Sequence, residues 1–174
     1  GEADTDLFSP KKKKSKGDTA ASPVSKENLA IAKSWLASSD EYNLLVNGTA
    51  ITAFPVYYQN DLALLRQSLR IVQAGTEVAE VKGKDLIPAH GLAMSRLLKT
   101  SVFPTEALTY EQAIAYLRKE AIVLPPSVPK GYVLVTYKEI PLGFVKNIGN
   151  RANNLYPQEW RIRSGYLPDD IRTL

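Results

Sequence analysis

The 174-residue chain is long enough for one ordinary domain or two small ones, and its 44% of hydrophobic residues predict a packed core. It has no cysteine and one histidine, which excludes disulfides, thiolate zinc sites, cysteine nucleophiles and histidine-rich metal sites. The net charge is +4, and because no apolar stretch is long enough for a membrane span or a secretion signal, we expect a soluble, cytoplasmic protein.

The first 24 residues, GEADTDLFSPKKKKSKGDTAASPV, are rich in lysine and nearly free of apolar side chains. Such a segment cannot bury enough surface to offset the entropy lost on ordering, so we expect residues 1–24 to be a disordered linker. The KKKK run is able to touch phosphates, but a solvated linker is the favoured interpretation. A start at Gly1 is typical of an expression scar, which would indicate a fragment of something longer.

Residues 25–40 are predicted to form a linking helix. Ser25 can cap a helix over residues 26–36, because its hydroxyl can accept a hydrogen bond from an amide of the first turn. The apolar residues of this segment recur at helical spacing on one face, which consists of Leu29, Ala32, Trp35 and Leu36.

Residues 41–100 have the pattern of a small α+β domain. Two apolar, β-branched runs flank Asn47-Gly48, the strongest short hairpin signal, because both turn residues then need positive φ. A Leu-rich stretch follows at 61–69, and residues 69–75 and 76–83 are predicted to be two further strands. Pro88 is expected to open an apolar helix that continues to about residue 98, with His90 in its first turn.

Residues 101–174 have the pattern of a second domain with short strands around one helix. Thr109 and Gln112 have the spacing of a capping box at the start of that helix. GYVLVTYKE and PLGFVKN are predicted strands, the Asn- and Gly-rich residues 147–154 a loop, and EWRIRSG a last strand-like piece. Such short strands with long loops favour a small barrel or a strongly curved sheet.

Catalytic patterns are weak throughout the chain. His90 has no partner cluster in sequence, so a histidine satisfied by backbone groups at a helix start is favoured over a general base. The glycines and lysine around residue 83 do not have the spacing of a phosphate-binding loop. Asp169-Asp170 are better explained as a flexible acidic end than as paired catalytic carboxylates. We therefore expect no catalytic centre in this chain.

The positive charge is concentrated near the end of the chain, where residues 130–165 hold six bases and two acids. Aromatic, Asn and Gly residues alternate with those bases, and RNA is recognised by stacking on rings together with hydrogen bonds to phosphate, sugar and base edges. Phe144 and Trp160 lie in strand-like runs and are favoured as core residues. On charge alone, RNA binding and a plain solvated face are equally good explanations.

The same stretch resembles the PUA-like domain at the C-terminus of the Nop/Sun family of RNA cytosine-5 methyltransferases, in its RsmF-like branch. The resemblance lies in VLVTY, PLGF, Lys146, Asn154, Tyr156-Pro157 and Arg161, and it extends to the preceding unit through His90 and Leu92-Ala93. It covers about residues 41–165. The chain departs from the pattern where Phe144 replaces a tryptophan, where Glu139 stands near a usual glycine, and at Val78-Ala79-Glu80, which lacks a glycine.

The resemblance implies an α+β fold in which a small mixed domain precedes a PUA-like β-barrel with a flanking helix. The family's catalytic half, with two cysteines and an S-adenosylmethionine site, has no counterpart here, so no cofactor is expected in this chain. The implied function is an RNA-binding, substrate-positioning region of an rRNA methyltransferase, with structured RNA and its own catalytic domain as partners. The candidate RNA-binding residues are Lys146, Arg151, Arg161 and Arg163 for phosphate, and Asn153, Asn154 and Tyr156 for sugar or base.

Two other functions stay open from the sequence. The chain is alternatively a structural module that stabilises the missing catalytic domain, with the apolar helix at 88–98 and exposed rings as the interface. An enzymatic role for the fragment itself would require a deep pocket that places His90 beside a carboxylate.

Overall fold

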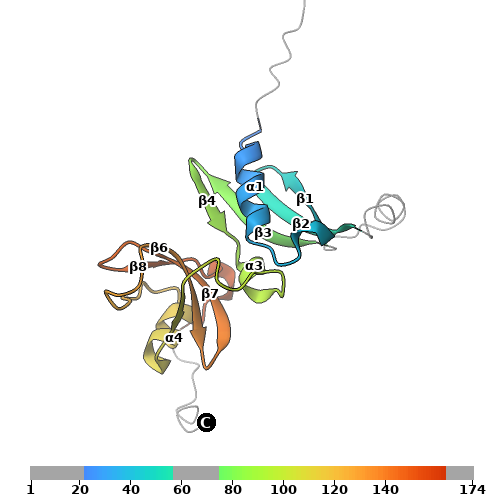
Figure 1. Cartoon of the computed structure of the whole chain (residues 1–174). Coiled ribbons are helices and arrows are strands. Elements are labelled where there is room, and N and C mark those ends of the chain that lie inside the picture. Colours follow the sequence, from blue (N-terminus) through green and yellow to red (C-terminus); the bar gives the residue numbers. More distant parts are fainter. Residues whose placement is uncertain (1–21, 57–74, 164–174) are drawn as a thin grey trace, which may run out of the picture.

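The computed structural model describes residues 22–56 and 75–163, which form two units, each built on a four-stranded sheet (Figure 1). Several expectations lie outside the described residues: nearly all of the linker, the Leu-rich stretch at 61–69, the strand before Gly75, and the acidic pair at 169–170. The first unit consists of the described residues up to 102, and the second unit of residues 103–163.

The first unit is an antiparallel sheet in the order β1-β2-β3-β4 with helix α1 on one face. Ser25 caps α1 by accepting a hydrogen bond from the Asn28 amide at 3.0 Å, which confirms the predicted cap. A short 3-10 turn precedes β1. The elements are α1 (Lys26–Ser34), η1 (Ser39–Glu41), β1 (Tyr42–Asn47), β2 (Ala50–Pro55), β3 (Thr76–Lys82) and β4 (Asp85–Pro88).

The predicted hairpin between β1 and β2 is confirmed, but its turn is shifted by one residue. Asn47 pairs with Ala50, so the two turn residues are Gly48 and Thr49, and of these only Gly48 has a positive φ, +60°. A turn with positive φ at its first position alone still matches the twist of the strands. The expectation of two positive φ values at Asn47-Gly48 is therefore wrong.

The helix predicted to begin at Pro88 is shorter than expected. Pro88 ends β4, where it pairs with Ala79, and α3 occupies only His90–Met94. The segment after α3 instead runs back along the first unit, because Leu98 forms an isolated bridge with Leu36. His90 does lie in the first turn of α3, as expected.

The second unit is a sheet in the order β5-β6-β7-β8 covered on one face by α4. The capping box is confirmed: Thr109 Oγ1 accepts from the Gln112 amide, and Gln112 Oε1 accepts from the Thr109 amide. The short strand β5 runs parallel to β6, and the sequence did not predict it. The elements are β5 (Thr105–Ala107), α4 (Tyr110–Leu117), β6 (Gly131–Tyr137), β7 (Ile140–Asn147), β8 (Ala152–Asn154) and η3 (Gln158–Trp160).

Two sequence expectations for the end of the second unit are wrong. Residues 147–154 are not a continuous loop, because residues 152–154 form β8 and pair with β7. EWRIRSG is not a strand over its described part, since Trp160 ends the 3-10 turn η3 and residues 161–163 have no regular structure. Asn and Gly lower strand propensity, but here the pairing edge of β7 overrides that preference.

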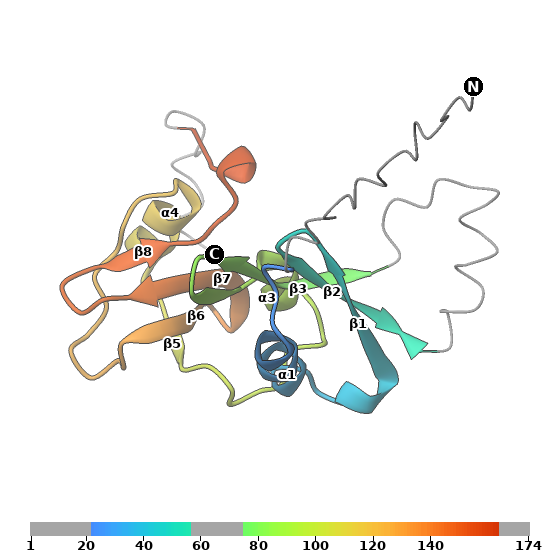
Figure 2. The ribbon, with the colours of Figure 1, turned by 90° about the horizontal axis from the view of Figure 1, so that it is seen from above.

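One of the two hydrophobic core clusters is shared by the two units, and the other lies within the second unit. Leu134 of β6 and Phe144 of β7 are buried among the core residues of the first unit. Phe103 joins the units, because its ring lies 5.2 Å from the ring of Trp35 and 5.0 Å from that of Phe144. Helix α3 contacts both β3 and β7 and lies between the two sheets (Figure 2).

The fold class is α+β, as predicted, with two sheets and few helices. Over the residues that the structure describes, no helix has the length and apolar character that crossing a membrane requires.

Candidate nucleic-acid interface

The pairing register divides the side chains of β6, β7 and β8 between two faces of the sheet. Tyr132, Lys146 and Asn153 stand directly opposite one another, so they share the face that turns toward the first unit. Val133, Val145 and Asn154 share the other face, under α4. The adjacent Asn153 and Asn154 therefore point to opposite sides.

Lys146 bridges the two units. Its Nζ lies 3.3 Å from Oδ2 of Asp85, the first residue of β4, and 5.6 Å from the ring centre of Tyr132. Burial raises the pKa of Tyr132, the Lys146 charge opposes this effect, and the Asp85 charge adds to it. The Lys146 and Asp85 side chains are 38% and 59% exposed, so water screens their attraction and the pair contributes little to stability.

Arg151 lies at the same end of the sheet, in the tight loop between β7 and β8. The loop is closed by a 3.0 Å hydrogen bond from the Ile148 amide to the Arg151 carbonyl. The buried Asn147 holds it in place, because its Nδ2 donates to the carbonyls of Val128 and Pro129 and its Oδ1 accepts from the Gly149 amide. Arg151 is exposed, so its guanidinium is accessible to a ligand.

Asn154 is occupied by the fold. Its Nδ2 donates to the carbonyls of Tyr116 and Glu120 at 2.7 and 2.8 Å, and its Oδ1 accepts from the Tyr156 amide at 2.8 Å. The two donated bonds tie Asn154 to carbonyls at the end of α4 and just after it. The structure thus assigns Asn154 a capping role and leaves no part of its amide directed at a ligand.

Tyr156, His90 and Trp160 form an aromatic cluster where α3 meets the second unit. The His90 ring lies 5.4 Å from that of Tyr156 and 5.3 Å from that of Trp160, in both cases edge to face. Tyr156 also contacts Tyr116, whose hydroxyl donates to the Phe144 carbonyl. Tyr156 is therefore mostly a packing residue.

Of the expectations for Phe144, Trp160 and His90, one is confirmed and two are wrong. Phe144 is 1% exposed and is a core residue, as predicted, whereas Trp160 is 60% exposed and is not. His90 is not satisfied by the backbone, because its Nδ1 is buried without a hydrogen-bond partner among the described residues. Burial lowers the pKa of His90, so the neutral ring is favoured.

Arg161 and Arg163 are not on the sheet strands that carry Lys146 and Asn153, but beside the end of α4. They flank Ile162, whose amide donates to the carbonyl of Leu117 at the end of α4. Arg163 is exposed and Arg161 is partly buried. The structure therefore brings three of the seven candidate residues together, and Asn154 and Tyr156 lie within the fold.

Two lysines that the sequence analysis did not single out stand near this site. Lys82 ends β3, and Lys119 follows α4 with its Nζ donating to the Asn154 carbonyl at 2.6 Å. Burial lowers the pKa of Lys119, the charge of Lys82 lowers it further, and Glu159 opposes both effects. No local sequence signal links residues 82 and 119, since only the docking of the two units makes them neighbours.

The described residues offer no group of three or more His, Asp or Glu side chains able to hold a metal ion. The neighbours that the His90 ring contacts are the rings of Tyr156 and Trp160. The exposed cations and aromatic rings of this site are suited to binding a charged ligand that carries rings. They are less suited to acid–base catalysis.

Comparison with known proteins gives two matches. Residues 103–162, almost all of the second unit, match the family model of the methyltransferase RsmF PUA domain. Over 138 residues the chain is 29% identical to the ribosomal RNA small subunit methyltransferase F of Enterobacter sp. (strain 638). The match covers 79% of this chain and 27% of that protein. Together they confirm the resemblance to an RsmF-like C-terminal region.

Proposed function

We propose that this chain is the RNA-binding, substrate-positioning region of an S-adenosylmethionine-dependent rRNA cytosine-5 methyltransferase, and that it is not catalytic by itself. The observation that carries the proposal is the match of residues 103–162 to the RsmF PUA domain. The similar Enterobacter protein is a small-subunit rRNA methyltransferase by name, which makes small-subunit rRNA the expected partner. The methyl donor and the reactive cysteines would belong to a separate catalytic domain, because this chain has no cysteine.

The accessible cations of the second unit support contacts with phosphate. Arg151 and Arg163 are exposed, and a guanidinium can form two parallel hydrogen bonds with a phosphate group. The ion pair of Lys146 with Asp85 is exposed and screened by water, so phosphate can compete with Asp85 for Lys146. Asn153, opposite Lys146, offers both a donor and an acceptor for a ribose or a base edge.

The contribution to methylation would be positional. Turning a cytosine out of a structured RNA costs a few kcal/mol, and contacts elsewhere on the RNA can supply that energy. Holding the RNA in one register also turns a loose encounter into an oriented one. Both effects require that this chain bind RNA without touching the reacting base.

Direct binding tests the proposal. The affinity of the chain for a fluorescent small-subunit rRNA hairpin is measured by anisotropy, for the wild type and for Arg151→Gln/Arg163→Gln. If three phosphates are contacted, affinity should fall about twentyfold between about 50 and 200 mM salt. The double variant should bind more weakly and with a shallower salt slope, whereas the control Lys33→Gln on α1 should behave as the wild type. Absent binding, or affinity that does not respond to salt, would contradict the proposal.

A structural role toward the catalytic domain is the second candidate. Ile140 and Val123 are 64% and 63% exposed, which favours some apolar contact outside this chain. Helix α3, however, buries Leu92 and Ala93 inside the chain itself, so it is not a free interface as the sequence suggested. RNA binding by the isolated chain would separate the two candidates.

A further inference from the structure

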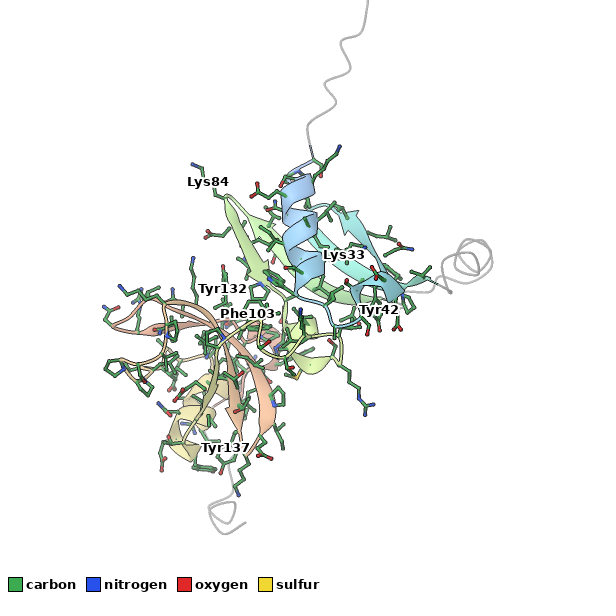
Figure 3. All side chains as sticks on the ribbon, in the orientation of Figure 1. Lys33, Tyr42, Lys84, Phe103, Tyr132 and Tyr137 are labelled. Atoms are coloured by element: carbon green, nitrogen blue, oxygen red, sulfur yellow. The ribbon has the colours of Figure 1, made fainter. Side chains whose placement is uncertain are left out.

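The two units meet along a surface that carries positive charge from three separate elements. We define this seam by Lys82 at the end of β3, Lys119 after α4, Lys146 on β7, and Trp160 in η3. The hairpin of β3 and β4 supplies one side of it, and the sheet of the second unit supplies the other. In Figure 3, Lys84 marks the tip of that hairpin and Tyr132 the near end of β6, while Tyr137 lies at the far end of the second sheet.

Contacts place the three lysines around the same few residues. Lys82 pairs in register with Asp85, and Asp85 binds Lys146 at 3.3 Å. Lys146 in turn stands opposite Asn153. The backbone carbonyl of the next residue, Asn154, accepts a hydrogen bond from Lys119 Nζ at 2.6 Å, and Lys119 is close enough to Lys82 to feel its charge. Lys119 follows Lys82 by 37 positions in sequence and Lys146 follows Lys119 by 27, so it is folding that brings the three lysines together.

The charges of the seam are only partly balanced. Asp85 forms an ion pair with Lys146, and the negative charge of Glu159 attracts Lys119. The positive charge of Lys82, however, repels Lys119. Like charges held near one another and partly out of water raise the energy of the unliganded chain. A run of phosphates would relieve that repulsion, which a neutral partner would not.

Trp160 adds an exposed aromatic ring to the charged groups of the seam. It directly follows Glu159 in η3, and its ring rests edge-on against His90 of α3. The indole is nevertheless 60% exposed. A ring fixed by one neighbour and open to solvent is the form of platform on which single-stranded nucleic acids stack their bases.

We propose that an unpaired stretch of RNA lies along the seam, with its phosphates on the three ammonium groups and one base stacked on the indole of Trp160. The inference rests on the proposed function and deepens it in two respects. It makes the first unit part of the RNA surface through Lys82, and it specifies unpaired rather than duplex RNA, because a base inside a helix has no free face to stack.

The test compares a fluorescent RNA hairpin with a blunt duplex of the same stem. The wild type should prefer the hairpin, and the hairpin should quench the exposed Trp160, since the other tryptophan, Trp35, is buried. Trp160→Leu should abolish the quenching and weaken hairpin binding by about fivefold to a hundredfold. Lys82→Gln should weaken binding and reduce the salt slope by about 0.7, and Lys33→Gln, an equal charge change on α1, should do neither.

Lysine acetylation gives an independent readout, because bound RNA should protect Lys82 and Lys119 and leave Lys33 reactive. If Lys82→Gln matches Lys33→Gln and Trp160 is not quenched while Arg151→Gln/Arg163→Gln still weakens binding, the seam is wrong and the proposed function stands. If the wild type binds no RNA, both are wrong.

Discussion

Single residues in the second unit carry strain or hydrogen bonds that reveal their roles. Lys138 and Glu139 form the turn between β6 and β7, and both have positive φ, 46° and 66°. This conformation suits glycine and costs other residues about 1–2 kcal/mol. Glu139, which stands near a usual glycine of the resembling family, thus occupies a strained position.

Replacing Glu139 by glycine should stabilise the chain. Relief of the strain exceeds the added flexibility of the unfolded chain, so Glu139→Gly should raise the free energy of unfolding by about 0.5–1 kcal/mol. The check is a higher urea midpoint with an unchanged slope. Lys84→Gly is the matched control, because Lys84 is also the second residue of a two-residue turn but lacks a positive φ. Equal effects of the two changes would contradict the argument.

The neighbours Asn153 and Asn154 should respond in opposite ways to alanine. Asn154→Ala removes two hydrogen bonds to the end of α4 and one from the Tyr156 amide, and should lower the free energy of unfolding by about 1–3 kcal/mol. Asn153→Ala should leave stability within about 0.5 kcal/mol of the wild type and weaken RNA binding. Urea unfolding and RNA anisotropy on both variants test this separation, and the reverse result would reassign the two amides.

His90 predicts how stability depends on pH. Burial lowers its pKa in the folded state below the ordinary value of 6.5, so folding favours the neutral ring. Its contribution is therefore present above pH 6.5 and is lost as pH falls through the lowered pKa. Thermal unfolding of His90→Gln should show a smaller loss of stability between pH 7.5 and 5 than the wild type, and an unchanged loss would exclude this role.

The helices and strands with strong local sequence signals were predicted correctly. The cap of α1, the capping box of α4 and the alternating run of β6 all lie where their residues indicated. Strand β8 and the parallel β5 were missed, because Asn-rich or three-residue strands are formed by an available pairing edge rather than by their own propensity. The convergence of Lys82 with Lys119 could not be predicted, because it depends on how two sheets dock.

The contact between β4 and β7 gives a prediction at this scale. Asp85→Asn removes the carboxylate that competes with phosphate for Lys146, so RNA affinity at low salt should rise severalfold. Because the pair is exposed, the free energy of unfolding should change by less than about 1 kcal/mol. Anisotropy titrations measure the first effect and urea unfolding the second. A fall in affinity would mean that Asp85 positions Lys146 for the RNA.

The whole described molecule should unfold as one cooperative body, since Phe144 of the second unit is buried in the core of the first. Phe144→Ala should lower the free energy of unfolding by about 3–5 kcal/mol. The fluorescence of Trp35, in a Trp160→Phe background, and far-UV circular dichroism should report the same midpoint before and after the change. Ile140→Ala, at an exposed position, is the control. Separate midpoints would show that the units unfold independently.

The shared core also bears on where the polypeptide can be divided for recombinant production. A piece beginning at Phe103, where the PUA match begins, would expose Leu134 and Phe144 to water and leave Phe103 without Trp35. Such a truncation invites aggregation despite its well-formed sheet. A fragment that stays folded has to begin early enough to include α1 and its cap at Ser25. The residue range needed for a stable fragment is therefore longer than the range that matches the PUA domain.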